Sequence, residues 1–250
     1  MNMDGRIALV TGGGRRLGRA IAVSLAENGA DVLLHVHSSS GSEVTHTIES
    51  LGRRAILLRA DLSTAKGAVH LGKEALQIFG HVDILINNAA VFFPTPISRI
   101  TTLSWKSIIQ TNLTASFFLA LVLGRSMRDQ GEGKIIQLGD WSGIRPLLGY
   151  LPYGVSKSGV FSFTQAFAKA WAPKVQVNAV APGPVLPPEQ YEEERKSLLT
   201  EQTPLRRLGH ESDVVRTVQF LVQSGDFVTG ATYFVDGGWL AKGAAGSEIS

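Results

Sequence analysis

The sequence predicts a single doubly wound α/β domain, and two observations indicate this fold class. Short apolar, often β-branched runs alternate with longer amphipathic stretches along most of the 250 residues. The runs are apolar over nearly their whole length, which is typical of parallel strands buried on both faces. The stretches between them are long enough to be the crossover helices that parallel strands require. We therefore expect about seven strands with helices on both faces of the sheet.

The expected elements follow one another in a regular order. The strands are Ile7–Val10, Val32–Val36, Ala55–Leu58, Ile84–Asn87, Lys134–Leu138, Val175–Val180 and Thr232–Val235. The helices lie near Arg16–Asn28, Gly41–Leu51, Thr64–Phe79, Ser104–Asp129, Gly154–Trp171 and Ser212–Gln223. No internal repeat or linker divides them, so residues 1–250 are expected to form one dinucleotide-binding and catalytic domain.

One segment, residues 183–209, interrupts the alternation. It is rich in Pro and Glu, allows one short helix, and follows the sixth expected strand. Open α/β sheets bind ligands beyond the carboxyl ends of their strands, so we interpret this segment as a substrate loop that acts as a lid. A solvated surface loop is the alternative. The small, polar tail at 241–250 is expected to be flexible.

Composition and charge exclude several kinds of protein. There is no cysteine, so disulfides and thiolate metal sites are excluded, and the six histidines lack metal-ligand spacing. The net charge of +3 is spread over scattered basic residues, which argues against a nucleic-acid surface. The start is short and polar and no apolar run approaches about 20 residues, so we expect neither a signal peptide nor a membrane span. A cytoplasmic protein is expected.

A glycine-rich turn follows the first expected strand and precedes a helix. It reads Thr11-Gly-Gly-Gly-Arg-Arg-Leu-Gly18. Glycines let the backbone turn sharply and approach a phosphate, and the helix N-terminus supplies free N–H groups and a favourable dipole. In this position the turn indicates a Rossmann-type nucleotide site.

The end of the second expected strand indicates which nucleotide is bound. NAD sites usually carry Asp or Glu there, to accept hydrogen bonds from the adenine ribose. This chain has His37, Ser38 and Ser39 instead, and Arg16 precedes them in the phosphate turn. These side chains suit a 2′-phosphate that an acid would repel, so the sequence favours NADPH. Asp61, after the third strand, is placed to meet the adenine amine.

Tyr153 and Lys157 are four residues apart at the start of an expected helix, so both side chains lie on one face. A tyrosine that exchanges a proton near neutral pH must act well below its usual pKa of about 10. A neighbouring ammonium favours the phenolate, so we expect Lys157 to lower the pKa of Tyr153.

Taken together, these motifs resemble the short-chain dehydrogenase/reductase family over about residues 5–239. The residues that carry the resemblance are Thr11–Gly18, Asp61, Asn87-Asn88-Ala89, Asn112, Tyr153, Lys157, Asn178, Pro182-Gly183 and Asp236-Gly237-Gly238. The resemblance implies that Asn112 anchors a water in a proton relay through Lys157 to Tyr153. It assigns structural roles to Asn178 and to the Asp236 segment. It also suggests a homotetramer built on the helices near Ser104–Asp129 and Gly154–Trp171.

Three positions depart from the family pattern: Arg16 in the phosphate turn, Ala90 after Asn-Asn-Ala, and Asp140. Asp140 stands thirteen residues before the tyrosine, where the family has its catalytic serine. A serine donates a hydrogen bond to a carbonyl oxygen, whereas an ionised aspartate cannot donate and repels an oxyanion. Asp140 therefore suits a substrate with N–H donors, or one that is protonated on nitrogen.

These departures occur together in the pteridine reductase branch, which this sequence is similar to at residues 11–18, 34–37, 87–96 and 140–153. The branch implies a pterin ring stacked between nicotinamide and Phe92, with Arg16 bridging cofactor phosphate and pterin. The resemblance implies cofactor contacts at Gly12, Arg16, Leu17, Gly18, His37, Ser38, Ser39, Asp61, Leu62, Asn88, Ala89, Lys157, Pro182, Gly183 and Val185. Substrate contacts are expected at Arg16, Phe92, Asp140, Tyr153 and Leu186, and catalytic roles at Asp140, Tyr153, Lys157 and Asn112.

The leading hypothesis is therefore NADPH-dependent reduction of the C=N bonds of a pterin or dihydropterin. A carbonyl or 3-oxoacyl reductase with an unusual acid is the enzymatic alternative. A nucleotide-binding regulatory protein without catalysis is the third possibility, and the presence of Tyr153 argues against it.

Overall fold

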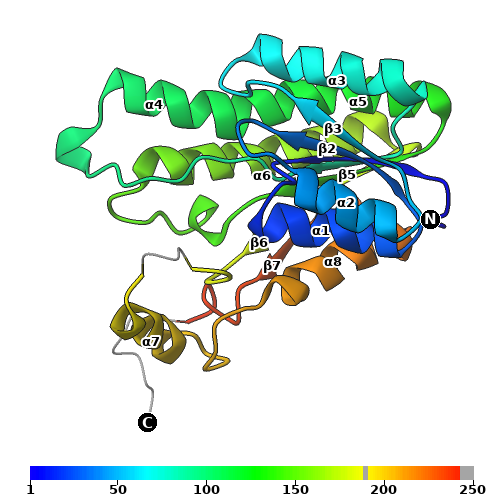
Figure 1. The fold of residues 1–250 in the computed structure, drawn as a ribbon. Helices are drawn as coiled ribbons and strands as arrows, with labels where there is room; N and C mark the ends of the chain where they lie inside the picture. Colours follow the sequence, from blue (N-terminus) through cyan, green and yellow to red (C-terminus); the bar gives the residue numbers. More distant parts are fainter. Residues whose placement is uncertain (188–190, 243–250) are drawn as a thin grey trace.

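In the computed structural model, seven parallel strands form one sheet at the centre of the molecule (Figure 1). The structure describes residues 1–187 and 191–242. The strand order is β3-β2-β1-β4-β5-β6-β7. Successive strands are added on one side of β1 up to β3 and on its other side from β4 onward, so the strand order reverses between β1 and β4. Nucleotides bind at such a switch point, beyond the carboxyl ends of the strands. The expected doubly wound, Rossmann-type fold is confirmed.

The strands begin and end within two residues of the positions expected from the sequence. They are β1 Ile7–Thr11, β2 Asp31–Val36, β3 Ala55–Arg59, β4 Ile84–Asn87, β5 Gly133–Leu138, β6 Val175–Pro182 and β7 Thr232–Val235. Every residue of β1, β2, β4 and β5 is buried. Burial on both faces explains why these strands are apolar throughout instead of alternating.

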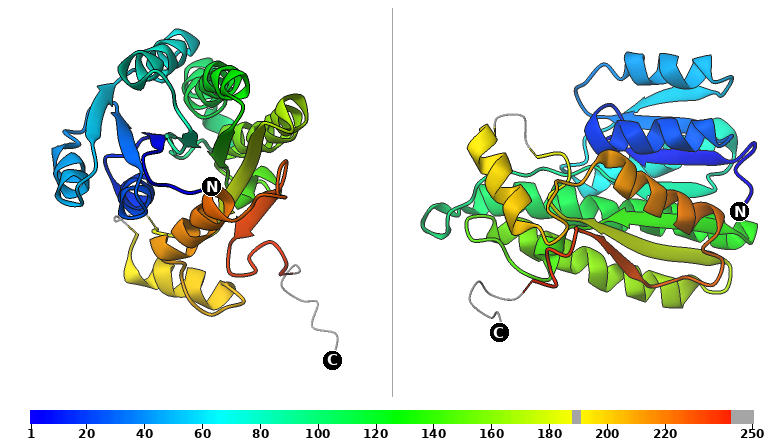
Figure 2. Two further views of the ribbon diagram at one scale, coloured as in Figure 1. Left: turned by 90° about the vertical axis from the view of Figure 1, so that its right-hand side faces the viewer. Right: turned by 90° about the horizontal axis from the view of Figure 1, so that it is seen from below.

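Helices cover both faces of the sheet (Figure 2). One layer holds α1 Arg16–Glu27, α2 Ser42–Ser50 and α8 Glu211–Gln223, which share a core with one face of the strands. The other layer holds α3 Ala65–Phe79, α5 Ala115–Gln130 and α6 Leu151–Trp171, with a second core. The short helix α4 Thr102–Ile109 precedes α5.

The long helical stretch expected near Ser104–Asp129 is interrupted by a π-helical turn, Gln110–Thr114, between α4 and α5. By length and composition alone, the stretch Thr102–Gln130 is apolar enough to cross a membrane. The expectation from the sequence concerned an unbroken apolar run, and polar residues such as Gln110, Asn112 and Ser116 interrupt this stretch. The helix packs on α3 and on the sheet, and 44% of its most apolar window is buried within the protein. A core helix of this fold accounts for that composition.

The segment after β6 carries the short helix α7 Glu193–Gln202, which has no buried residue. Residues 188–190 of this expected substrate loop lie outside the described residues. Most of the expected flexible tail, 243–250, lies outside them too. Its first two residues, Ala241 and Lys242, are described, and the Lys242 ammonium lies 3.5 Å from the centre of the Trp239 ring.

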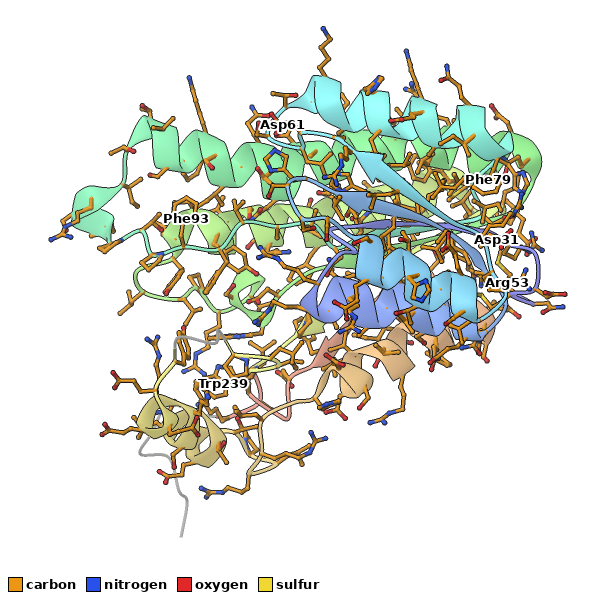
Figure 3. The ribbon with its side chains drawn as sticks, viewed as in Figure 1. Asp31, Arg53, Asp61, Phe79, Phe93 and Trp239 are labelled. Atoms are coloured by element: carbon orange, nitrogen blue, oxygen red, sulfur yellow. The ribbon has the colours of Figure 1, made fainter. Side chains whose placement is uncertain are left out.

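The two ends of the sheet carry different side chains (Figure 3). Asp31, at the start of β2, is paired with Arg54 at 2.7 Å. Asp61, just after β3, lies at the opposite end of the strands, and Phe93 and Trp239 lie on that side of the molecule as well. The expected nucleotide and catalytic residues gather at this end, where the strands have their carboxyl ends.

Candidate active site

Asp140, Tyr153 and Lys157 come together where β5 ends and α6 begins. The Tyr153 hydroxyl donates a hydrogen bond to Asp140 Oδ2 at 3.3 Å. Asp140 Oδ1 accepts from the backbone N–H of Ser142 at 2.8 Å, which fixes the carboxyl group at the start of a short 3₁₀ turn. The Lys157 ammonium donates to the Leu138 carbonyl of β5 at 2.7 Å and lies 5.6 Å from the centre of the Tyr153 ring.

The electrostatics of this group differ from the expectation. Burial raises the pKa of Tyr153 well above its ordinary value, and the Asp140 carboxylate raises it further. The expectation that Lys157 lowers the pKa of Tyr153 was therefore wrong. The reasons are that the tyrosine is buried and that an anionic carboxylate, which accepts a hydrogen bond from its hydroxyl, stands where the family has a neutral serine. Tyr153 is held in its protonated form.

The two neighbours of Tyr153 are shifted by burial as well. Burial raises the pKa of Asp140, although hydrogen bonds from Ser142 and the charge of Lys157 oppose this. Burial lowers the pKa of Lys157 to about 8, against the attraction of Asp140. Titratable groups shifted in opposite directions within one cleft are typical of catalytic sites.

Asn112 lies in the π-helical turn, and its side chain holds the backbone of Val91. Its Oδ1 accepts from the Val91 N–H at 2.8 Å, and its Nδ2 donates to the Val91 carbonyl at 2.9 Å. Nδ2 also lies 3.4 Å from the Ser156 hydroxyl. The side chain therefore positions the segment that leads to Phe92, while the relay through Asn112 stays a prediction.

Phe92 lies beside the catalytic tyrosine and is 43% exposed. Its ring meets Tyr153 edge-on at 4.8 Å and stacks on Tyr150 at 4.4 Å with an interplanar angle of 6°. The sequence analysis did not assign Tyr150 to the site. Its spacing, three residues before Tyr153 at the start of a helix, is the signal that would have placed it on the same face.

The phosphate turn ends in a helix whose first amides have no side-chain cap. The N-cap of α1 is Arg15, which is extended and makes no capping hydrogen bond, and the first turn holds no acid. By contrast, the Thr64 side chain caps α3. Free N–H groups at the end of a helix dipole form an anion site, so this end of α1 fits the pyrophosphate of a nucleotide.

Close packing explains two of the glycines in this turn. Gly12 has φ +63°, a left-handed conformation that suits glycine. A Cβ on Gly18 would lie 2.2 Å from the Gly12 carbonyl oxygen, so only glycine lets α1 begin here. Asn88 holds the turn from β4, because its Nδ2 donates to the Thr11 carbonyl at 2.9 Å.

The end of β2 carries no acid, and its loop is held by a cation. His37, Ser38 and Ser39 are exposed. Arg59, at the end of β3, donates to the Ser39 carbonyl at 3.0 Å. The sequence analysis missed Arg59, which brings a positive charge to the region expected to receive the 2′-phosphate.

Asp61 has both carboxylate oxygens engaged by Ser63, through its backbone N–H and its hydroxyl, each at 2.8 Å. These bonds lower the pKa of Asp61. His37 lies 4.0 Å from the same carboxylate. The remaining expected cofactor residues lie at or just beyond the carboxyl ends of strands or at the start of α1: Leu17, Leu62, Ala89, Pro182, Gly183 and Val185.

Arg16 reaches from the phosphate turn to the loop after β6. Its guanidinium donates to the Leu186 carbonyl, and Arg16 has φ +51° while Leu186 has φ +48°. Arg16 and Leu186, both expected to contact substrate, are therefore brought together.

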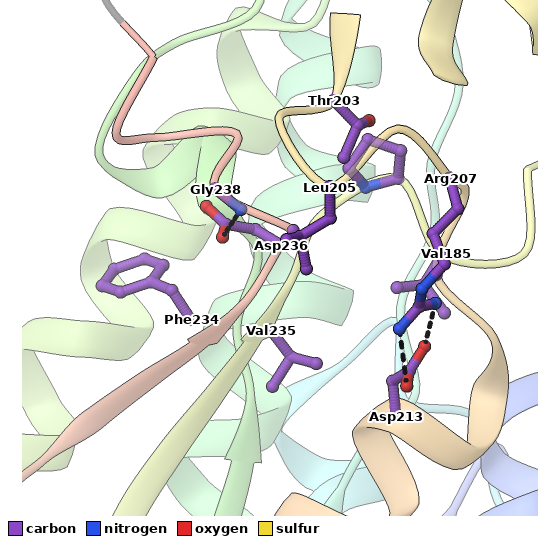
Figure 4. Close-up of a pocket in the computed structure, with 12 residues that line it drawn as sticks. Val185, Thr203, Leu205, Arg207, Asp213, Phe234, Val235, Asp236 and Gly238 are labelled. Carbon is purple, nitrogen blue, oxygen red and sulfur yellow. Dashed lines mark hydrogen bonds and ion pairs between the residues drawn. The ribbon is translucent and has the colours of Figure 1, made fainter. Parts of the chain in front are cut away.

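A cavity of about 380 Å³ is lined by the base of the substrate loop and by the end of β7 (Figure 4). Val185, Leu205 and Val235 form its apolar walls, and Arg207 pairs with Asp213 at 2.7 Å on one side. Asp140, Tyr153 and Lys157 do not line it. The cavity is thus separate from the catalytic group.

Comparison with known proteins identifies the class of this enzyme. Residues 6–197 match the family model described as short chain dehydrogenase. The chain belongs to this family and is an oxidoreductase. Enzymes of the family use a nicotinamide cofactor, and the uncapped end of α1 and the glycine turn fit such a group.

Several curated relatives match almost the whole chain. It is 32% identical to the 2-dehydro-3-deoxy-D-gluconate 5-dehydrogenase of Escherichia coli K12, over 96% of this chain and 98% of the relative. It is 34% identical to the 3-oxoacyl-[acyl-carrier-protein] reductase of Vibrio cholerae, over 95% and 98%. These names describe carbonyl chemistry, so the relatives support the family and do not support the pteridine reductase branch specifically.

Solved structures agree with the fold over nearly the full length. A putative short-chain alcohol dehydrogenase from Sinorhizobium meliloti 1021 superposes with a TM-score of 0.91 and 36% identity, covering 97% of this chain and 100% of that one. A blue fluorescent protein from a metagenomic library, crystallised in complex with NADPH, gives 0.89 and 31%, covering 96% and 99%.

Proposed function

We propose that this enzyme uses NADPH to reduce the C=N bond of a flat nitrogen heterocycle of the pterin class. The observation that carries the proposal is Asp140, a carboxyl group hydrogen-bonded to Tyr153 in the place of the family's serine. The activities for which its relatives are named favour carbonyl substrates instead, so the pterin proposal depends on this chain's own residues.

NADPH is favoured over NADH by the charges around the adenine end. The loop after β2 presents His37 and two serines without an acid, and Arg59 holds this loop. A carboxylate, which would accept from the ribose 2′-hydroxyl, is missing from this loop in the described chain. The NADPH bound to one structural neighbour is consistent with this choice.

The chemistry follows from the protonation states of Asp140 and Tyr153. When bound, the cofactor would supply hydride to the carbon of the C=N bond. The nitrogen must also gain a proton. Tyr153 carries one, and because its raised pKa makes it a weak acid, the phenolate that it leaves must be stabilised. Lys157 lies close enough to stabilise the phenolate that remains. The Asp140 carboxylate accepts hydrogen bonds from N–H groups of the substrate. Because its pKa is raised, Asp140 can also take part in returning a proton to Tyr153.

Phe92 supports a flat substrate because its ring lies against Tyr153 at the mouth of the cleft. Stacking on an aromatic face favours planar heterocycles over flexible sugar acids or acyl chains. Arg16, drawn across to Leu186, leaves a guanidinium beside the position expected for the pterin.

Carbonyl or 3-oxoacyl reduction is the second candidate, and the names of the relatives favour it. If Asp140 is protonated when substrate binds, its O–H can donate to a carbonyl oxygen as a serine does. The raised pKa of Asp140 makes this form accessible. The two candidates differ in whether Asp140 must be ionised.

The test follows NADPH oxidation with dihydrobiopterin, biopterin, folate and a panel of simple ketones and 3-oxoacyl thioesters. We expect pterin turnover in the native enzyme and a loss of about 100-fold or more in Asp140→Ser, with ketone turnover kept or raised. Asp140→Asn is the matched control of equal size, and NADPH affinity reports intact folding. Unchanged pterin turnover in Asp140→Ser would refute the pterin assignment.

We also propose that the enzyme is a homotetramer acting in the cytoplasm on a small molecule. An apolar groove lies between α5 and α6, lined by Leu113, Phe117, Phe118 and Phe163. Phe117 and Phe118 are only partly buried within one chain. Association through this face would remove their rings from water.

A further inference from the structure

His35 is a buried histidine on β2 that touches the ends of three strands. It is 2% exposed. Its Nδ1 accepts a hydrogen bond from the Gly12 N–H at 3.2 Å, and its backbone carbonyl accepts from the Gly13 N–H at 3.0 Å. Its Nε2 lies 3.1 Å from the Ala60 carbonyl oxygen, at the end of β3. A single ring therefore connects the phosphate turn to the adenine side of the nucleotide site.

These partners determine which ring nitrogen carries the proton. The Ala60 carbonyl oxygen can only accept, so Nε2 carries the hydrogen. In a neutral ring Nδ1 then has a free lone pair, which is what the Gly12 N–H requires. Burial lowers the pKa of His35, which keeps the ring neutral. The bond to Ala60 thus selects the tautomer that can hold Gly12.

Gly12 is the residue on which the shape of the phosphate turn depends. Its N–H is bound by His35, and its carbonyl oxygen accepts from Asn88 Nδ2 at 3.3 Å. The same carbonyl packs against Gly18 at the start of α1. A rotation of the Gly12 peptide would therefore move the first turn of α1, whose free amides form the phosphate site.

We propose that His35 is a positioning residue for nucleotide binding: it holds Gly12, and through it the phosphate turn, in the conformation that accepts the pyrophosphate. This inference depends on the nicotinamide cofactor and is independent of which substrate is reduced. It concerns the turn, so it applies equally to NADPH and NADH.

Two variants with amide side chains distinguish the two hydrogen bonds that the His35 ring makes, one with the Gly12 N–H and one with the Ala60 carbonyl. His35→Asn places an amide oxygen near the position of Nδ1 and can still accept from Gly12. His35→Gln carries its amide one bond further, near Nε2, and can still donate to Ala60 but leaves Gly12 without an acceptor. Each variant loses one of the two bonds, so the two should be destabilised to a similar extent.

The experiment measures the Kd of NADPH and of NADH by fluorescence titration, together with the thermal midpoint of each variant. We expect His35→Gln to raise the Kd of either cofactor about tenfold or more, and His35→Asn to stay within about twofold of the native protein. Similar thermal midpoints in the two variants would show that the difference is not general destabilisation.

The proposal is overturned if the His35→Asn and His35→Gln variants have equal Kd values for the cofactor. It is also overturned if both variants keep the Kd of the native protein and differ from it only by a lower thermal midpoint. A wrong assignment of NADPH as the preferred cofactor is a separate result. It would appear as tighter binding of NADH than of NADPH by the native enzyme. The difference in Kd between the His35→Asn and His35→Gln variants would then still be found with NADH.

Discussion

Replacing Lys157 with methionine should change how stability depends on pH. The pKa of Lys157 is lowered from 10.5 to about 8 because the ammonium is buried. Between these values the unfolded chain binds more protons at this residue than the folded protein does. Stability therefore rises as pH increases from about 8 to 10.5, and burial of the ammonium costs stability below that window.

Lowering the pKa from 10.5 to about 8 corresponds to about 3 kcal/mol at neutral pH. Between pH 7 and pH 10, the native protein should regain most of this cost. Lys157→Met never carries the charge and shows no such gain. It also loses the hydrogen bond to the Leu138 carbonyl, but that loss is nearly independent of pH.

The assay is urea unfolding of both proteins at pH 7 and pH 10. We expect the free energy of unfolding of Lys157→Met, relative to the native protein, to fall by about 2 to 3 kcal/mol across this range. Titrating groups far from Lys157 are common to both proteins and cancel in the difference. A difference that does not change with pH would show that Lys157 is not destabilised by burial, and the reasoning would fail. Reductase activity should be lost in the variant.

Three further predictions concern the cofactor, the substrate and the assembly. Ser38→Asp should shift preference from NADPH toward NADH by about tenfold or more, measured as the ratio of the two Kd values, because the acid repels a 2′-phosphate. Phe92→Ala should raise the KM for dihydrobiopterin about fivefold through lost stacking while leaving the Kd of NADPH unchanged; a change in NADPH affinity alone would contradict its role as substrate wall. Phe118→Glu should dissociate the proposed tetramer in sedimentation velocity with an unchanged circular dichroism spectrum, and a native protein that sediments as a monomer would contradict the proposed assembly.

The fold could be predicted because a strand that is buried on both faces is apolar along nearly its whole length, and such runs can be recognised in the sequence. The β4 strand, Ile84–Asn87, was predicted without error, since its neighbours on both sides of the sheet require apolar residues throughout. The π-helical turn at Gln110–Thr114 could not be predicted from the local pattern; it carries Asn112, whose side chain binds Val91, 21 residues away in the sequence.

The catalytic side chains could be located from spacing, but their electrostatics could not. Four-residue spacing placed Tyr153 and Lys157 on one face, as the structure shows. Whether Tyr153 is driven toward phenolate or held protonated depends on distances to Asp140 and on burial, which the sequence does not contain. His35 was missed for the same reason, since an apolar strand gives no sign of which of its side chains reaches a neighbouring turn.

The uncapped first turn of α1 connects the lifetime of this enzyme to the supply of its cofactor. Side chains cap α3, α4 and α8, whereas the free amides at the start of α1 are placed for a bound phosphate. A ligand that binds only the folded protein adds about 2.7 kcal/mol of stability when its concentration is 100 times the Kd. Since α1 packs between α2 and α8, loosening of its start would spread to that whole layer. Cells poor in the cofactor should therefore contain less of the enzyme, because the unbound protein opens and is degraded sooner.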